Sequence, residues 1–77
     1  MARQYMITST MGGTTLQIDE EGTSEEVPLE AASDQGRLRE AEEIINSRYY
    51  RQSPFAGFHW QSMSSGGWLT TDHDLKS

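Results

Sequence analysis

The sequence contains no cysteine, and this absence excludes three kinds of chemistry at once. Disulfide cross-links, thiolate zinc sites and thiol nucleophiles all need that side chain. The chain also lacks any apolar run close to the roughly 20 residues with which a helix crosses a bilayer. Residues 1–7 do not form the apolar block of a signal peptide. We therefore expect a soluble cytoplasmic protein with no membrane contact.

The side chains that most often fill protein cores are scarce as well. Leucine, isoleucine, valine and phenylalanine together number 12 among 77 residues. A chain this short buries only about 60% of its unfolded surface, so its core is thin. Two tryptophans, three tyrosines and four methionines supply part of the missing apolar volume. We expect residues 1–77 to form a single small domain.

Basic residues are half as frequent as acidic ones. Six stand against twelve, so the net charge is −6 and the pI is about 4.6. Because proteins bind phosphates mainly through lysine and arginine, direct nucleic-acid binding is disfavoured. Asp19–Asp34 contains seven acids and no base, whereas Arg37–Arg51 contains four arginines. This pattern fits a protein partner with a basic or nucleic-acid-binding surface, and it also fits a solvated loop beside a salt-bridged helix.

Alternation of polar and apolar residues predicts a β-hairpin over residues 3–20. Two alternating segments flank Gly12-Gly13, and a two-residue glycine loop is typical of hairpins because their turns need positive φ. With this loop, Ile7 lies opposite Ile18. One predicted face carries Tyr5, Ile7, Met11, Leu16 and Ile18. The other predicted face carries Met6, Thr8, Thr10, Thr15, Gln17 and Asp19.

The next two stretches have contrasting patterns. Residues 20–33 are acidic and contain Pro28, which disfavours a central strand or a helix interior, so we expect an acidic loop. Val27 and Leu29 can form a short edge segment there or anchor the loop on the core. Over residues 33–50, apolar residues spaced by three or four positions predict a helix with Ser33 or Asp34 as its N-cap. Its apolar stripe consists of Leu38, Ala41, Ile44, Ile45 and Tyr49.

A second hairpin is predicted over residues 57–74. Its strands, 58–63 and 68–74, flank Ser64-Ser65-Gly66-Gly67, of which either the two glycines or all four residues form the loop. Both loops place Trp68 on one face with Met63, and Leu69 on the other face with Phe58 and Trp60. The predicted fold is therefore α+β, a four-stranded antiparallel sheet in β-β-α-β-β order with one helix packed on one face.

Trp68 is the starting point for a predicted partner-binding surface. Because one helix covers only one face of such a sheet, the alternation places Trp68, Met63 and Met6 on the uncovered face. Tryptophan is enriched at binding hot spots, so these residues predict a protein-contact patch. Alternatively, residues 20–33, the C-terminal tail or a second copy of the chain in a homodimer covers this face.

Charged residues extend the predicted surface. Four acids are expected to stand in for phosphates toward a basic partner: Glu20, Glu21, Glu25 and Glu26. Arg48 and Arg51 are predicted to contact an acidic patch on a protein. Alternatively, the basic and aromatic residues of 48–58 stack on single-stranded nucleic acid.

The sequence has no constellation that predicts catalysis or metal binding. His59 can lie opposite Asp72 or Asp74 on the face with Trp68, but His73 is expected on the opposite face. The two imidazoles therefore diverge, which disfavours a shared metal site. Asp72 and Asp74 are expected to be solvated. No Gly-x-Ser-x-Gly elbow and no phosphate-binding glycine loop before a helix occurs. We therefore expect no catalytic residue, no metal and no cofactor, and a protein that is not an enzyme.

Four stretches carry a resemblance to known proteins: Tyr5-Met6-Ile7-Thr8, Thr15-Leu16-Gln17-Ile18, the helix around residues 38–49, and residues 60–71. In size, acidity, lack of cysteine and the predicted β-β-α-β-β order of these stretches, the chain resembles small phage-encoded anti-defence proteins, especially anti-CRISPR inhibitors. The resemblance implies a stoichiometric inhibitor that occupies a nucleic-acid site or locks an effector complex in the host cytoplasm. The expected function is thus that of a small acidic protein-binding inhibitor. The alternative is a structural or assembly protein that forms a homo-oligomer through the exposed sheet face.

Overall fold

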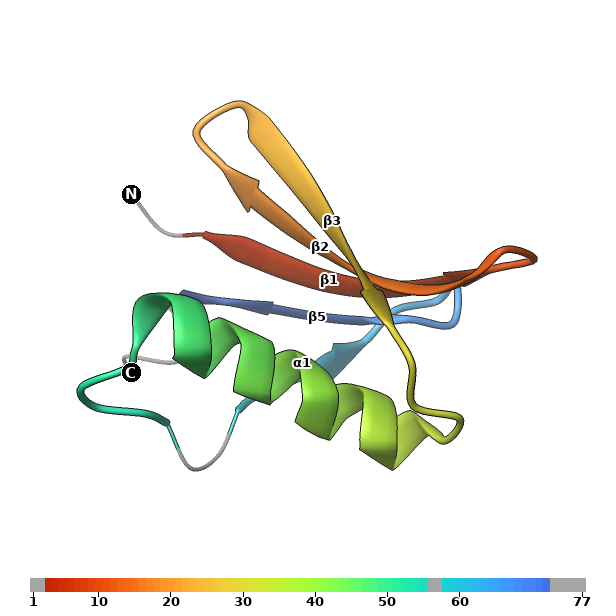
Figure 1. Ribbon diagram of the computed structural model, residues 1–77. Helices are drawn as coiled ribbons and strands as arrows, with labels where there is room; N and C mark the ends of the chain where they lie inside the picture. Colours follow the sequence, from red (N-terminus) through yellow and green to blue (C-terminus); the bar gives the residue numbers. More distant parts are fainter. Residues whose placement is uncertain (1–2, 56–57, 73–77) are drawn as a thin grey trace.

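The computed structural model describes residues 3–55 and 58–72, which form one antiparallel sheet and one α-helix. The elements are β1 (Gln4–Thr10), β2 (Gly13–Glu20), β3 (Thr23–Leu29), α1 (Asp34–Tyr49), β4 (Gln61–Ser62) and β5 (Trp68–Thr71). The strands lie in the order β3-β2-β1-β5-β4, and α1 lies along one face of the sheet (Figure 1). The α+β class is confirmed. The predicted four strands in β-β-α-β-β order are wrong, because a third strand precedes the helix.

The extra strand, β3, replaces the acidic loop that we expected over residues 20–33. Glu21 and Gly22 form the turn before it with φ values of 48° and 84°, and two positive φ values match the twist of a two-residue hairpin. Pro28 is tolerated because β3 is an edge strand, where the missing N–H group costs no ladder hydrogen bond. Val27 and Leu29 pack on the core, so the edge-segment alternative is correct and extends over seven residues.

The β1–β2 hairpin has the predicted apolar face but not the predicted turn. Met11 and Gly12 connect the strands, and Gly13 begins β2 at φ 124°, a conformation that other residues rarely adopt. The register is shifted by two residues from our prediction, and a shift of two keeps every strand residue on its face. Met11, which we expected on the apolar face, is exposed in the turn. The face is buried as predicted at Tyr5, Ile7, Leu16 and Ile18.

The helix agrees with its predicted bounds to within one residue at each end. Ser33 is its N-cap and accepts a hydrogen bond of 3.1 Å from the N–H group of Gly36. Ala41 and Ile45 are fully buried against the sheet, as the apolar stripe predicted. Glu40 accepts hydrogen bonds from the backbone N–H groups of residues 30 and 31, which ties the connection after β3 to the helix.

The β4–β5 hairpin differs from the prediction by one residue in register, and this reverses its faces. The N–H group of Met63 donates to the carbonyl of Gly67 at 2.8 Å, so the loop between them contains three residues instead of two or four. An odd change in register exchanges the two faces of a strand relative to its partner. Trp68 therefore lies opposite Ile7 on the helix-covered face, while Leu69 faces away from the helix. Residues 57, 73 and 74 of the predicted hairpin lie outside the described residues.

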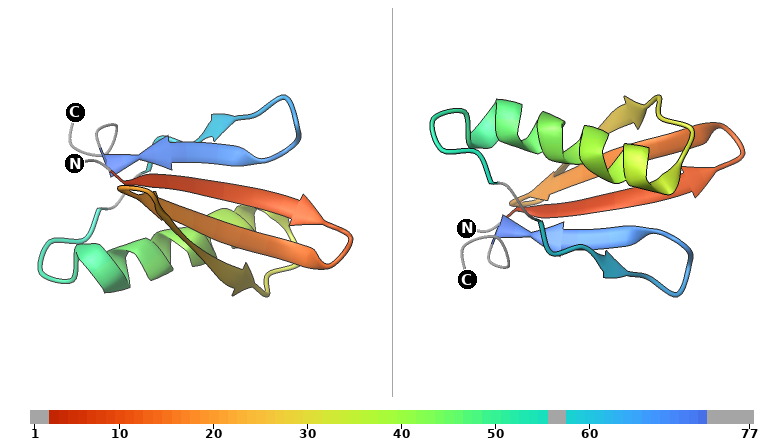
Figure 2. Two further views of the ribbon diagram at one scale, coloured as in Figure 1. Left: turned by 90° about the horizontal axis from the view of Figure 1, so that it is seen from above. Right: turned by 90° about the horizontal axis from the view of Figure 1, so that it is seen from below.

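Aromatic rings close the layer between α1 and the sheet beyond the aliphatic core. Tyr50, Phe55, Phe58 and Trp60 form a row with successive ring centroids 4.7, 6.2 and 6.0 Å apart. Asn46 holds the start of this segment on the helix, since its amide exchanges two hydrogen bonds of 3.1 Å with the backbone of Phe55. The described residues on either side of positions 56–57 thus lie on the helix-covered side of the sheet (Figure 2).

We expect Gly67→Ala to lower the free energy of unfolding by about 3 kcal/mol. A Cβ atom at Gly67 would overlap the backbone carbonyl oxygen of Ile7 and lie 2.8 Å from Cε of Met63. Gly12→Ala is the matched control, because its Cβ would meet only Oγ1 of Thr10 at 3.7 Å. Urea denaturation of both variants measures the difference. Equal stabilities would contradict the close approach of β5 to β1 at this residue.

Candidate interaction surfaces

The structure separates the three residues of the predicted apolar patch. Trp68 is half-buried on the helix-covered face and packs against the core, so the expectation that it lies on the uncovered face is wrong. Met6 does lie on the uncovered face, opposite Leu69 and Gln17. Met63 is half-buried at the base of the β4–β5 loop, beside Gly67. The reversed register of β5 thus replaces Trp68 with Leu69 as the neighbour of Met6.

One row of side chains crosses the whole uncovered face. Residue pairing places Glu26 of β3, Gln17 of β2, Met6 of β1, Leu69 of β5 and Gln61 of β4 side by side. We call these five residues the central row. Met6 and Leu69 are both half-buried at its middle. The centre of the row is therefore apolar, its flanks are amides, and one end is a carboxylate.

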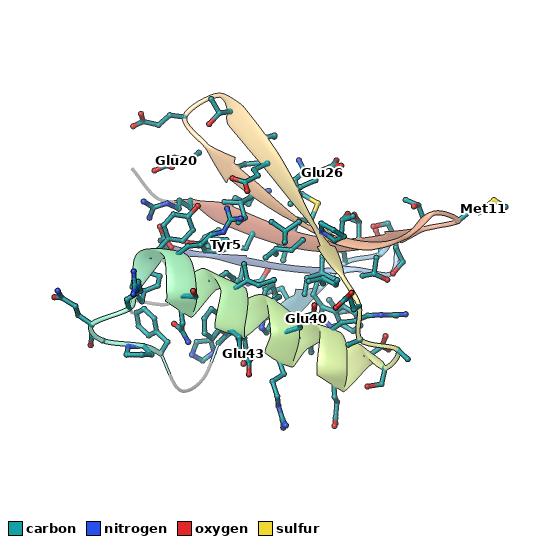
Figure 3. The ribbon with its side chains drawn as sticks, viewed as in Figure 1. Tyr5, Met11, Glu20, Glu26, Glu40 and Glu43 are labelled. Atoms are coloured by element: carbon teal, nitrogen blue, oxygen red, sulfur yellow. The ribbon has the colours of Figure 1, made fainter. Side chains whose placement is uncertain are left out.

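The β2–β3 hairpin carries the predicted acidic residues, but the structure divides them into two groups. Glu20 forms an ion pair with Arg3 at 3.3 Å, and Glu25 forms one with Arg48 at 2.6 Å. Glu21 in the turn and Glu26 on the uncovered face are exposed and pair with none of residues 3–55 and 58–72. Figure 3 shows Glu26 on the side of the sheet away from the helix. No described arginine thus lies in an ion pair with Glu21 or Glu26.

Arg48 and Arg51 lie near the end of α1, on the other side of the molecule from the uncovered face. Residues 48–53 line a shallow pocket of about 320 Å³ there. Arg48 is engaged by Glu25, whereas the side chain of Arg51 is exposed. The structure does not bring these two arginines together with Met6 or Met63.

Asp72 is the residue whose environment differs most from the prediction. We expected a solvated carboxylate near His59, but Asp72 is only 4% exposed, and His59 is exposed. The Asp72 carboxylate accepts hydrogen bonds from the hydroxyl groups of Tyr5 and Tyr50, the latter at 2.5 Å. It also accepts bonds of 3.0 and 3.1 Å from the backbone N–H and the guanidinium of Arg3. These partners lie 22 to 69 residues away in sequence, so no local pattern could have revealed them.

The hydrogen bonds decide the charge state of this cluster. Burial alone would raise the pKa of Asp72, but the bonds from Tyr5, Tyr50 and Arg3 outweigh it and hold the pKa below its ordinary value. Burial, followed by the bond to Asp72, raises the pKa of Tyr50 to about 12 and that of Tyr5 well above its ordinary value. The guanidinium of Arg3 also lies 3.9 Å above the ring centroid of Tyr49. At neutral pH the site is thus one carboxylate compensated by one guanidinium and two neutral phenols.

Comparisons with known proteins give no family or neighbour for this chain. No protein-family model matches it, and no curated protein or solved structure matches it either. Among residues 3–55 and 58–72, no group of three or more potential metal ligands occurs. None of the described helices has both the length and the apolar character that spanning a membrane requires.

We expect Asp72→Asn to lower the free energy of unfolding by about 3 kcal/mol, because it leaves Arg3 and the two phenols without their charged acceptor. Asp34→Asn is the matched control. Its carboxylate is 67% exposed and pairs with Arg37 at 3.4 Å, so its loss should cost less than about 1 kcal/mol. Urea denaturation at pH 7 measures both. A smaller loss for Asp72→Asn than for the control would contradict the role of Asp72.

The same cluster predicts how stability depends on pH. The pKa of Asp72 is lower in the folded protein than in the unfolded chain, so the unfolded chain binds a proton more readily. Asp72 therefore stabilises the fold above its ordinary pKa of 3.8, and this stabilisation is lost as the pH falls through the pKa of the folded state. The pKa of Tyr50 is raised in the folded protein. Tyr50 therefore stabilises the fold below its ordinary pKa of 10.0, and this stabilisation is lost as the pH rises toward the folded pKa of about 12. Urea denaturation from pH 2 to 12 should show both losses. Asp72→Asn should weaken the acid loss, and Tyr50→Phe should weaken the alkaline one; unchanged pH profiles would contradict this assignment.

Proposed function

We propose that this chain is a small acidic, non-enzymatic binding protein that inhibits a nucleic-acid-handling complex by occupying a basic surface of one of its proteins. The observation that supports this most directly is the separation of two unpaired acids of the β2–β3 hairpin from every described arginine. Glu21 and Glu26 project from the β2–β3 hairpin without a partner among the described residues. The described arginines lie in α1, just after α1, or just before β1. The size, acidity and lack of cysteine that the chain shares with anti-CRISPR inhibitors agree with this proposal, whereas the strand order on which that resemblance also rested is not the one in the structure.

Electrostatics explains how such a protein would act. A surface that binds nucleic acid is basic, and an acidic protein with a net charge of −6 is attracted to it over a Debye length of about 8 Å at physiological salt. Carboxylates that occupy the surface displace the phosphates that would otherwise bind there. Inhibition of this kind needs a stable complex and no chemical step, and its association rate falls as salt rises.

The test compares two double variants that remove the same charge. Glu21→Gln with Glu26→Gln neutralises the hairpin, and Glu30→Gln with Glu43→Gln neutralises two exposed acids elsewhere. Wild-type protein is immobilised, a partner is captured from the native lysate, and association of that partner with each variant is measured by surface plasmon resonance at two salt concentrations. We expect the hairpin variant alone to slow association, and a DNA oligonucleotide to release the captured partner.

Two results would contradict the proposal. One is equal association of both variants with a partner that DNA does not release. The other is a concentration-independent oligomer of the chain by light scattering, with no partner bound, which would favour the alternative of a structural protein that assembles with itself.

A further inference from the structure

We infer that the uncovered face of the sheet is the docking site, and that its occupant is a protein surface on which lysine or arginine side chains surround an apolar group. This inference rests on the proposed function and gives it a location. In the complex, Met6 and Leu69 would contact the apolar group, and Asp19 and Glu26 would pair with the basic side chains.

The first support is the composition of the central row. The solvated face of an antiparallel sheet is normally polar along each strand. Here Met6 and Leu69 are neighbours on the adjacent strands β1 and β5, and the glutamines Gln17 and Gln61 flank them. An apolar centre with an uncharged polar border is the arrangement found at protein interfaces, where methionine is enriched because its flexible side chain adapts to a partner.

The second support is charge complementarity. At the strand positions on this face, the charged residues are Asp19 and Glu26, and the others are uncharged. The five described arginines all lie elsewhere: Arg3 faces Tyr49 on the covered side, and the others belong to α1 or follow it. A partner with positive charge on its surface would therefore bind this face more tightly than an uncharged one. A second copy would bring the same acidic face against its own, so the occupant is a different protein.

The third support is the sheet beneath this face. The opposite sides of the same strands are packed against α1, and the rows beside the central one contain β-branched threonines such as Thr8 and Thr15, which have few rotamers. The backbone under the central row is therefore held in place before binding, and the threonines beside the row lose little side-chain entropy when they are covered. Strand addition at β3 is a poorer mode, because Pro28 cannot donate and Glu25 and Glu26 charge that edge.

The inference is tested with a synthetic amphipathic peptide of alternating lysine and leucine as the probe. Backbone amide chemical shifts of the protein are followed by NMR during a titration at low salt. We expect the shifts to concentrate at the central row, and affinity to fall about tenfold in the double variant Met6→Thr with Leu69→Thr. Threonine preserves strand propensity at these positions. Met11→Thr is the control, since Met11 is exposed at the tip of the β1–β2 hairpin, outside the central row (Figure 3).

A second pair of variants separates location from total charge. Glu26→Lys and Glu43→Lys change the net charge equally, and these residues lie on opposite sides of the molecule in Figure 3. We expect Glu26→Lys to weaken peptide binding at least fivefold and Glu43→Lys to have less than a twofold effect. Circular dichroism confirms that each variant is folded.

The outcomes distinguish the docking site from the proposed function. Salt-sensitive binding that Glu26→Lys and Glu43→Lys weaken equally, or shifts confined to α1, overturns the docking site and leaves the proposed function standing. Absence of any binding to the basic peptide overturns both. A dimer that dissociates in the Met6→Thr, Leu69→Thr variant shows that the occupant is a second copy and also overturns the inference.

Discussion

The buried carboxylate of Asp72 is the interaction on which the rest of this structure depends. Its four hydrogen bonds come from the start of β1 and the residue after α1, while Asp72 itself follows β5. A buried charge is stable only when it is fully compensated, so these three segments must meet in one arrangement. The backbone N–H group of Asp72 adds a bond of 3.0 Å to the carbonyl of Arg3 and continues the β1–β5 ladder. The cluster therefore fixes both the position and the register of β5.

The register of β5 in turn determines which side chains the protein presents. Trp68 and Thr70 face α1 because they lie opposite Ile7 and Tyr5, and Leu69 consequently faces away. The indole that a simple alternation assigns to the surface thus helps to fill a core that has few aliphatic residues. The apolar centre of the uncovered face comes from Met6 and Leu69 instead.

Charge has two different uses in this chain. Glu20 pairs with Arg3 just before β1, and Glu25 pairs with Arg48, which holds the β2–β3 hairpin near the end of α1. Glu21 and Glu26 have no such partner among the described residues, and they lie at the tip and on the uncovered face of the same hairpin. A segment with seven acids and no base is therefore partly structural, and its charge count alone overstates what is available to another molecule.

Local sequence patterns were enough to predict α1, to limit its N-cap to Ser33 or Asp34, and to predict the buried face of the β1–β2 hairpin, because neighbouring residues impose those patterns on one another. These patterns were insufficient to predict β3, because its edge position tolerates Pro28 and its Glu25 pairs with Arg48 of α1. They were also insufficient for the β4–β5 loop, where a difference of one residue exchanges Trp68 with Leu69. The surroundings of Asp72 depended on residues up to 69 positions away. Short-range patterns thus determined where most helical and extended segments lie and which face of the β1–β2 hairpin is buried. Strand register, the pairing of charges and the composition of the exposed face followed from contacts that exist only after the chain has folded.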